Sequence, residues 1–320
     1  MKAIIYRNFG SPTVLEPADL KKPIPKANEV LIKVKATTVT SADSMMRRGD
    51  TFFSRILLGF TRPKKKFQIL GTEFSGIIES VGSNVTKFQT GDEIFAFRGF
   101  GTGCYAEYKC MNQNGSIALK PVNMSFLEAA SLVDGASTAY FFLKEKANIQ
   151  EGQKVLINGA SGSIGTFAVQ IAKYFGAEVT AVCSTKNLEL VKSLGADKVI
   201  DYTKEDFTKT GIQYDIIFDT VGKSSFAKCK NVLNSSAKYV TTVMTLKSLL
   251  QSILTKFGNK KKVIFEMSIN KTDALKFIKT LVEDGKLITI IDKQYPLKEL
   301  TQAHTYVEKG HKQGNVVIEV

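Results

Sequence analysis

The sequence predicts an α/β protein in which a β-rich region precedes a doubly wound parallel sheet. In "EVLIKVKATTV", residues 29–39, apolar residues alternate with two lysines, as in a strand with one buried face. From Lys154 onward, strand-like and helix-like segments alternate at regular spacing, which is typical of a parallel sheet. The first strand and helix of that series are joined by the glycine-rich stretch "INGASGSIG".

The first region continues with short strand-like runs. "EFSGIIESVG", "DEIFAF" and "CYAEYKCM" are separated by turns that contain glycine, which predicts a β-rich domain over residues 1–122. The pattern changes at Ser125, which forms a capping box with Glu128 and opens a helix running toward residue 149.

The second region reads as six strands with helices between them. The strands are "KVLIN", "EVTAVC", "KVIDY", "YDIIFDTV", "KYVTTV" and "KVIFEMS", and two of the intervening helices end at Gly176 and Gly195. We expect these strands to form a doubly wound sheet in a nucleotide-binding domain over residues 123–286. Residues 287–320 should return to the first domain, because the final strand "NVVIEV" needs a partner and the parallel sheet already has six strands.

The composition excludes several classes of protein. The chain of 320 residues is 43% hydrophobic and 23% charged, as in globular proteins. Residues 155–172 carry no charge, but their polar residues and glycines argue against stable membrane insertion. The first residues lack the pattern of a secretory signal, so we expect a cytoplasmic protein.

Cysteine, histidine and charge patterns give no separate function. The four cysteines form no C-x-x-C pair and the chain has two histidines, which favours reduced thiols over a metal centre. The net charge of +14 comes from lysines spread along the chain, without a nucleic-acid recognition motif beside them. We therefore expect no nucleic-acid partner.

The glycine-rich stretch predicts a dinucleotide site. Gly159, Gly162 and Gly165 form G-x-x-G-x-x-G between a strand and a helix. The first glycine suits a tight turn, the second lets backbone N–H groups approach a pyrophosphate, and the third lets helix and strand pack closely. The competing interpretation is a structural turn.

The end of the second strand indicates which dinucleotide binds. An NAD site places a carboxylate there, whereas this chain has Ser184, Thr185 and Lys186, with no carboxylate before Glu189. Two hydroxyls and a cation suit a 2′-phosphate, so NADP is favoured, although Lys186 alone would also suit a solvated first helical turn.

At this point the chain resembles the medium-chain dehydrogenase/reductase superfamily along essentially its whole length. The resemblance rests on "MKAIIYRNFGSPTVLE", "PKANEVLIKVKATTV", "GTEFSGIIESVGSNVTKFQTGDEIFAF", "YAEY", the glycine stretch, "SLGADKVIDY", "DIIFDTVG" and "HKQGNVVIEV". It implies a GroES-like catalytic domain, a Rossmann NADP-binding domain, an active site between them, and a homodimer.

Zinc-binding members of the superfamily have Cys and Gly-His-Glu where this chain has Thr40 and "GTE", with Thr72 before Glu73. Threonine oxygens do not replace a thiolate and an imidazole, and the four-cysteine lobe of a structural zinc is missing, so we expect no metal. The chain looks most like the zinc-free quinone oxidoreductases of the zeta-crystallin type, which use NADPH.

The resemblance also implies roles for individual residues. Ser184, Lys186 and Tyr202 would surround the 2′-phosphate, and the pyrophosphate would lie along Ser161, Gly162, Ser163 and Ile164. Val221, Gly222 and Val243 would approach the nicotinamide, Thr40 would touch the nicotinamide or substrate, and Asn315 stands where relatives often have lysine. No proton donor is identifiable.

The resemblance implies that two apolar segments, "FFSRILLGF" from Phe52 and "LKSLLQSILTKF" from Leu246, flank the substrate entrance. Met45, Phe52, Phe53 and Leu250 could line it, with dimer-interface or core packing equally open for each. Each segment is followed by three lysines, Lys64–Lys66 and Lys260–Lys262.

The sequence thus predicts an NADPH-dependent, zinc-independent oxidoreductase that transfers hydride to a small hydrophobic acceptor, a quinone or an α,β-unsaturated carbonyl. One alternative is a reductase of small activated alkenes such as enoyl thioesters or haloacrylates. Another is a non-catalytic NADPH-binding or membrane-peripheral protein that uses the two apolar-basic segments.

Overall fold

The structure, a computed structural model, describes residues 1–50, 52–243, 245–255 and 260–320; the side chains of Phe52, Phe53, Leu57 and Phe100 also lie outside the description. The chain divides into two compact units. Unit 1 comprises Met1–Asp134, Ile269–Asp284 and Ile291–Val320, and unit 2 comprises Gly135–Ser268 and Gly285–Ile290. These packing units do not coincide with the predicted domains 1–122, 123–286 and 287–320, whose boundaries stay a prediction.

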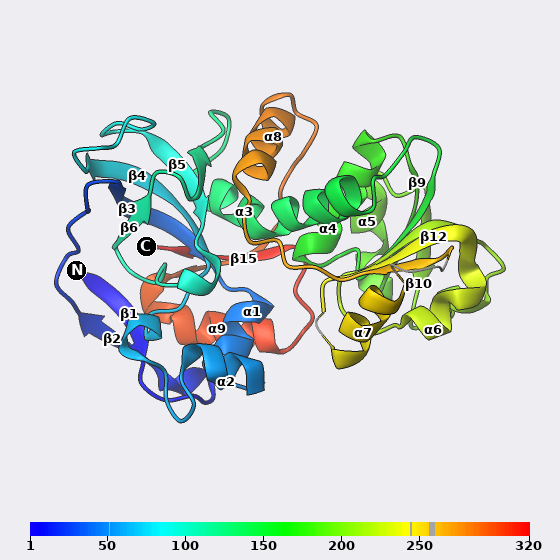
Figure 1. Cartoon of the computed structure of the whole chain (residues 1–320), viewed down its shortest axis with the longest axis horizontal. Coiled ribbons are helices and arrows are strands. Elements are labelled where there is room, and N and C mark those ends of the chain that lie inside the picture. Colours follow the sequence, from blue (N-terminus) through cyan, green and yellow to red (C-terminus); the bar gives the residue numbers. More distant parts are fainter. Residues whose placement is uncertain (51, 244, 256–259) are drawn as a thin grey trace. The chain divides into compact units, whose positions relative to one another are not determined.

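Unit 1 is built on a seven-stranded sheet. Its strand order is β14 (Ile291–Pro296), β15 (Asn315–Glu319), β3 (Glu29–Thr38), β4 (Glu73–Val81), β5 (Glu93–Phe97) and β7 (Ser116–Leu119), with β6 (Tyr108–Asn112) paired to β3. A separate antiparallel pair joins β1 (Lys2–Tyr6) and β2 (Leu15–Asp19). The last strand β15 pairs antiparallel with β3, so the end of the chain returns to the first sheet (Figure 1).

One face of β3 packs into an apolar cluster of unit 1. Val30, Ile32 and Val34 are buried and pack in one apolar cluster with Phe74 and Ile78 of β4, whereas Lys33 points outward and is exposed. The predicted strands of this region are therefore confirmed, and burial of one face explains their pattern.

The helices of unit 1 are α1 (Ser41–Arg48), α2 (Phe52–Leu58), α8 (Thr272–Glu283) and α9 (Leu300–Glu308), with short helices at Pro12–Val14, Lys65–Phe67, Gly99–Gly101 and Leu297–Glu299. The helix α3 (Phe126–Tyr140) begins in unit 1 and continues as a π-helical segment, Phe141–Lys146, in unit 2. The predicted capping box is present, because the Ser125 N–H donates to the Glu128 carboxylate at 2.8 Å and the Glu128 N–H donates to the Ser125 hydroxyl at 3.3 Å.

Unit 2 is a parallel sheet of six strands, and all six predicted strands are confirmed. The order is β10 (Lys198–Asp201), β9 (Glu178–Cys183), β8 (Lys154–Asn158), β11 (Tyr214–Asp219), β12 (Leu233–Thr241) and β13 (Lys262–Ile264). Its helices are α4 (Ser163–Tyr174), α5 (Leu188–Ser193), α6 (Phe226–Cys229) and α7 (Leu246–Leu254), with short helices at Thr185–Asn187, Phe207–Lys209 and Lys230–Val232.

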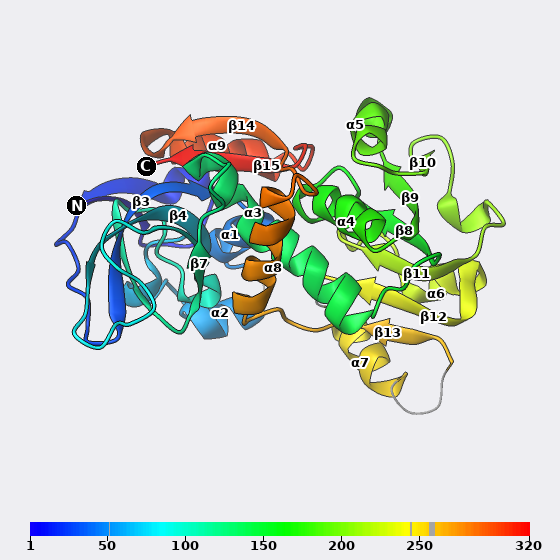
Figure 2. The same ribbon diagram turned by 90° about the horizontal axis from the view of Figure 1, so that it is seen from above.

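The strand order sets the place of a ligand site in unit 2. Within this sheet, β8 comes first in sequence, and β9 and β10 follow it toward one edge. The chain then returns to the other side of β8, where β11 pairs with it (Figure 2). In such sheets ligands bind beyond the carboxyl ends of the strands at this reversal. A ligand site in unit 2 is therefore expected among the residues that follow β8, β9, β11 and β12. Within the described ranges, no helix is both long and apolar enough to cross a bilayer.

Candidate functional site: a dinucleotide seat and a buried polar cluster

The glycine loop connects β8 to α4 and leaves space for a ligand at one of its three glycines, Gly162. Gly159 has a φ of +86°, and a Cβ there would stand 2.5 Å from a Val221 methyl carbon. A Cβ at Gly165 would stand 2.1 Å from the Gly159 carbonyl oxygen, so no larger residue fits. At Gly162, the N-cap of α4, the nearest described atom to an added Cβ is 3.5 Å away. The loop therefore packs tightly at two glycines and leaves the N-terminus of α4 approachable at the third, as the pyrophosphate interpretation requires.

A buried amide ties the glycine loop to the end of β9. The Asn187 side-chain nitrogen donates to the Ser161 hydroxyl at 2.8 Å and to the Ser184 hydroxyl at 3.3 Å. Asn187 is buried, so it fixes both hydroxyls relative to the strand ends. Asn187 was not predicted, although it directly follows the Ser184–Lys186 stretch in the chain.

A carboxylate also lies beside the end of β9. Asp201, the last residue of β10, accepts hydrogen bonds from the Thr185 hydroxyl and, at 2.7 Å, from the Thr203 hydroxyl. These bonds, led by the one from Thr185, lower the pKa of Asp201. Thr185 thus joins β9 to β10. Lys186 and Tyr202, the residues that follow Thr185 and Asp201 in the chain, are exposed, and Asp201 forms an ion pair with Lys204 at 3.8 Å.

A second buried acid holds the loop after β11. The Asp219 carboxylate accepts from the N–H groups of Val221 at 3.2 Å, Gly222 at 2.9 Å and Ser224 at 3.1 Å. It also accepts from the Asn158 amide at 3.0 Å and the Tyr239 hydroxyl at 2.9 Å, and it is fully buried. Burial, together with the Asp219 charge, raises the pKa of Tyr239, which keeps this phenol protonated as a donor.

The residues predicted to approach the nicotinamide lie together at this edge of the sheet. Val221 packs against Gly159, and a Cβ on Gly222 would stand 2.8 Å from a Val243 methyl carbon. The structure thus brings together the glycine loop and the loops after β11 and β12. Asp219, Asn158 and Tyr239 were not predicted, because their roles depend on the register that pairs Asn158 with Asp219.

In unit 1, Thr40 caps a helix. Its hydroxyl accepts from the Asp43 N–H at 3.1 Å, and the Asp43 carboxylate accepts from the Thr40 N–H at 2.9 Å, which forms a capping box at the start of α1. Asp43 is buried, and burial raises its pKa to about 6 despite hydrogen bonds from Thr40 and the Gly71 N–H. A contact between Thr40 and a nicotinamide stays a prediction.

The two positions where zinc ligands would be expected do not form a metal site. The Thr72 hydroxyl is buried without a hydrogen-bond partner among the described residues. Glu73 accepts from the Thr38 hydroxyl and the Asp134 N–H, and burial and the Asp134 carboxylate raise its pKa to about 8. The part of the chain that the structure describes contains no cluster of three His, Cys, Asp or Glu suited to a metal. These threonine hydroxyls and a largely protonated Glu73 do not fit zinc.

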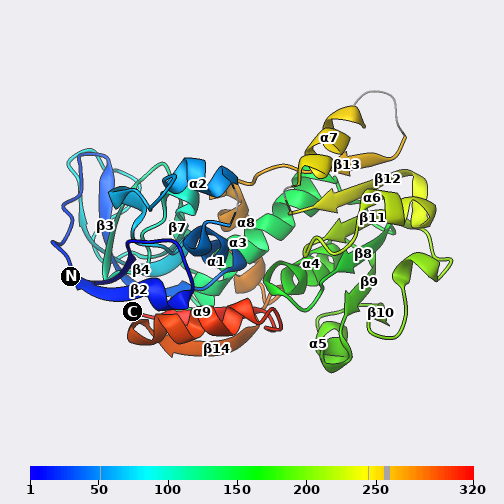
Figure 3. The same ribbon diagram turned by 90° about the horizontal axis from the view of Figure 1, so that it is seen from below.

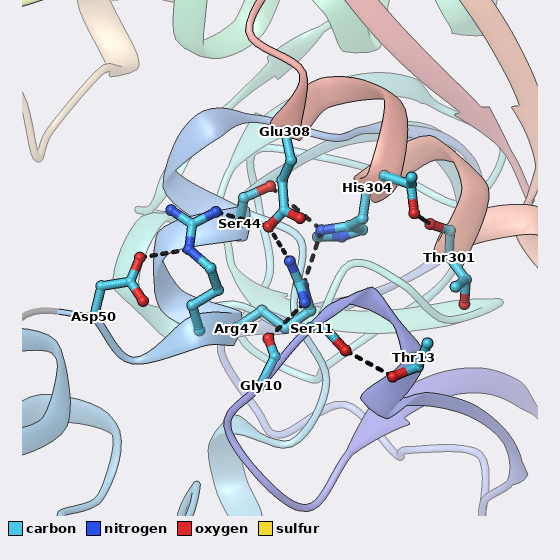
Figure 4. A network of polar contacts seen from close by, with 11 residues as sticks. Gly10, Ser11, Thr13, Ser44, Arg47, Asp50, Thr301, His304 and Glu308 are labelled. Carbon is cyan, nitrogen blue, oxygen red and sulfur yellow. Dashed lines mark hydrogen bonds and ion pairs between the residues drawn. The ribbon is translucent and has the colours of Figure 1, made fainter.

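A further buried polar cluster joins α1 to α9 (Figure 4). Arg47 forms an ion pair with Glu308, donates to the Gly10 carbonyl at 2.6 Å, and donates to His304 Nδ1 at 3.4 Å. Burial, followed by the charges of Arg47 and Arg48, lowers the pKa of His304 to about 3. His304 is therefore neutral, and the cluster serves to anchor α1.

The residues predicted for a substrate entrance lie in both units, and the entrance stays a prediction. Met45 on α1 and Leu250 on α7 are exposed and belong to different units, and the side chains of Phe52 and Phe53 lie outside the described residues. Hollows of about 340 Å³ in unit 2 and 430 Å³ in unit 1 are lined by other residues. Asn315, the first residue of β15, is buried in unit 1.

Together these features define a class of fold: a Rossmann-type parallel-sheet unit on the same chain as a β-rich unit. Comparison with known families agrees. Residues 26–122 match the alcohol dehydrogenase GroES-like domain, and residues 194–318 match a family described as zinc-binding dehydrogenase.

Similar proteins and structures cover the whole chain. A "Quinone-oxidoreductase homolog, chloroplastic" of Spinacia oleracea is 33% identical over 331 residues, covering 100% of this chain and 98% of the relative. An "NADPH-dependent alkenal/one oxidoreductase, chloroplastic" of Arabidopsis thaliana is 31% identical over 332 residues, covering 99% and 79%. The structure of the quinone oxidoreductase from Coxiella burnetii superposes with a TM-score of 0.90 at 30% identity, covering 100% and 99%.

The chain therefore belongs to the medium-chain dehydrogenase/reductase superfamily, and quinone oxidoreductases are among its homologues. The predicted fold, a GroES-like domain with a Rossmann parallel sheet, is confirmed.

Proposed function

We propose that this protein is an NADPH-dependent, zinc-independent oxidoreductase that passes a hydride to a quinone or an α,β-unsaturated carbonyl. The observation that carries the proposal is the organised carboxyl edge of the unit 2 sheet. There an approachable glycine loop, the hydroxyls fixed by Asn187 and the loop fixed by Asp219 lie at the ends of neighbouring strands. The printed names of the similar proteins support the choice of acceptor.

Binding of the cofactor falls to residues of unit 2. The N-terminus of α4, from its N-cap Gly162 to Gly165, would hold the pyrophosphate, since a helix N-terminus favours anions. Ser184 and Lys186 would hold the 2′-phosphate beside Tyr202. Thr185, within the predicted phosphate seat, donates to the Asp201 carboxylate, whose charge would oppose a 2′-phosphate there, so the preference for NADPH over NADH should be modest.

The nicotinamide end of the cofactor would contact the loop after β11. When bound, NADPH supplies a hydride from C4 of its nicotinamide. Asp219 fixes the backbone of Val221 and Gly222, and Val243 packs beside them, so these residues would set the position of the ring. Their role is orientation, since none of the three has a side chain that could exchange a proton.

The residues of unit 1 at the positions of zinc ligands restrict which substrates could accept the hydride. Thr40 and Thr72 offer hydroxyls where a zinc enzyme needs a thiolate and an imidazole, so no Lewis acid at these positions would stabilise a developing alkoxide. A quinone or enone does not need one, because the carbon that accepts hydride is conjugated with an oxygen that takes the charge. The alternative, reduction of small activated alkenes such as enoyl thioesters or haloacrylates, follows the same logic.

Several predictions accompany the proposal. Thr40, Asn315, Met45 and Leu250, with Phe52 and Phe53, stay predicted contacts of the nicotinamide or the substrate. A homodimer and a cytoplasmic location also stay predictions; the two plant relatives are named as chloroplastic proteins.

The test is an acceptor screen with both cofactors. The purified chain should oxidise NADPH faster than NADH with quinones or enones, and the relative rates on quinones, enones, enoyl thioesters and haloacrylates would rank the acceptor classes. Binding of NADPH without turnover of any acceptor would instead support a non-catalytic NADPH-binding protein and overturn the enzymatic proposal.

A further inference from the structure

Helix α7 of unit 2 presents its apolar side chains to solvent. The exposed fractions are 77% for Leu246, 42% for Leu249, 52% for Leu250, 50% for Ile253 and 67% for Leu254. Their spacing of three and four residues places them on one helical face. The opposite side carries Ser248 and Ser252, which are buried. This arrangement reverses the usual orientation of a surface helix, and a contiguous exposed apolar face of this kind marks an interaction site.

Polar side chains fix α7 in this orientation. The Thr245 hydroxyl accepts from the Ser248 N–H at 2.9 Å, and the Ser248 hydroxyl donates to the Val243 carbonyl at 3.3 Å. At the other end the buried Thr255 hydroxyl accepts from the Val263 N–H of β13 at 3.0 Å. Turning the leucines inward would break these bonds, so the apolar face belongs to the folded unit.

The surroundings of α7 are strongly basic. Residues 220–265 contain nine lysines and no Asp, Glu or Arg. Lys247 on α7 and Lys260 and Lys262 after it are exposed. Helix α7 packs beside β13, at the end of the sheet away from β10, and Figures 2 and 3 show it there. An apolar helical face and a lysine-rich segment that contains no Asp or Glu between residues 220 and 265 therefore lie next to β13, at one end of the unit 2 sheet.

We propose that α7 docks unit 2 on the surface of an anionic lipid bilayer. The helix would lie in the plane of the interface with its leucines at the acyl boundary and its lysines among the headgroups. Charge complementarity favours an anionic bilayer over a second copy of the chain as the partner of α7. A second copy presenting the same face would bring two acid-free, lysine-rich segments together, which costs free energy, whereas anionic headgroups attract them. The proposal concerns binding only and does not depend on the proposed reductase activity.

The test is co-sedimentation of the full chain with vesicles. Vesicles of phosphatidylcholine with about 30% phosphatidylserine should bind the protein at least about tenfold more tightly than pure phosphatidylcholine. Raising the salt from about 0.05 M to about 0.5 M should weaken this binding, because the screening length shrinks.

Two double variants separate the apolar and basic contributions. Leu246→Ser with Leu254→Ser removes apolar contact, and Lys247→Gln with Lys260→Gln removes charge; each should weaken binding to the anionic vesicles several-fold. The matched controls alter equally exposed positions elsewhere: Ile24→Ser with Val122→Ser, 78% and 85% exposed in the native protein, and Lys21→Gln with Lys209→Gln. The controls should bind as the native protein does.

Three results would overturn the proposal. One is binding that the α7 variants leave unchanged, and another is an equal loss in the control variants. The third is the absence of vesicle binding together with a native dimer that the α7 variants convert to monomers in light scattering, which would assign the face to a second copy.

Discussion

Each unit contains a buried polar network, and the two networks differ in the sequence separation of the residues that they join. In unit 2 the Asp219 carboxylate collects three backbone N–H groups from the five residues that follow it, and thereby shapes a loop at the ligand edge of the sheet. In unit 1 Arg47 and His304 join helices whose contacting residues stand 257 positions apart in the chain. The first network shapes a loop at the proposed binding site, and the second joins two helices of the fold.

This difference makes separate predictions for the two networks. Loss of Asp219 should cost both stability and cofactor binding, because buried donors lose their acceptor. Changes at His304 should alter stability, and its dependence on pH, without a direct effect on the cofactor.

The largest effect is expected for Asp219→Ala. It leaves three N–H groups and the Tyr239 hydroxyl without their acceptor, and such losses sum to about 3–5 kcal/mol of unfolding free energy. Urea unfolding measures this. Asp206→Ala is the matched control, because Asp206 also accepts backbone and hydroxyl hydrogen bonds but is exposed, and it should cost about 1 kcal/mol. Equal losses in the two variants would contradict the central role of Asp219.

The next largest effect is the loss of folding stability at low pH that comes from His304. Because burial lowers the pKa of His304 to about 3, the folded protein keeps this side chain neutral while the unfolded chain binds a proton below about pH 6.5. Stability from His304 is therefore present above that pH and lost as the pH falls, by up to about 1.4 kcal/mol per unit.

His304→Gln removes this titration. Urea unfolding at pH 7 and pH 5 should show the native protein losing more stability than the variant between the two values. A variant that loses as much as the native protein would show that His304 is not the titrating group. Cofactor affinity of the folded variant at pH 7 should be unchanged.

The smallest effect is expected at the 2′-phosphate seat. Lys186 is exposed and therefore screened by solvent, so Lys186→Gln should lower the preference for NADPH over NADH only a few-fold. Dissociation constants for both cofactors measure it, with Lys209→Gln as the control. An unchanged preference would place the phosphate elsewhere.

The same contrast explains how far the sequence could be interpreted. The six parallel strands and the glycine loop follow from local patterns, namely apolar runs and glycines at fixed spacing, and the structure confirms the strands. The capping box at Ser125 was likewise local. What the sequence did not reveal depends on contacts between distant segments.

Asp219 looked like any residue at a strand end, and its role appears only when β11 pairs with β8 and places it beside Asn158. Arg47, His304 and Glu308 carry no shared motif, because their contact exists only after α1 and α9 pack. The entrance predicted around Met45 and Leu250 has no local signal of proximity in the sequence, and it stays a prediction.

The central claim, that the glycine loop is the cofactor seat, is tested most directly at Gly162. Its φ of −81° and ψ of 177° suit any residue, and the described atoms leave its Cβ position open, so Gly162→Val should fold with a capping cost of about 1 kcal/mol. A side chain there would block the approach of the pyrophosphate to α4. The account predicts that NADPH binds the folded variant at least about tenfold more weakly than the native protein. Native-like NADPH affinity in the folded Gly162→Val variant would contradict it.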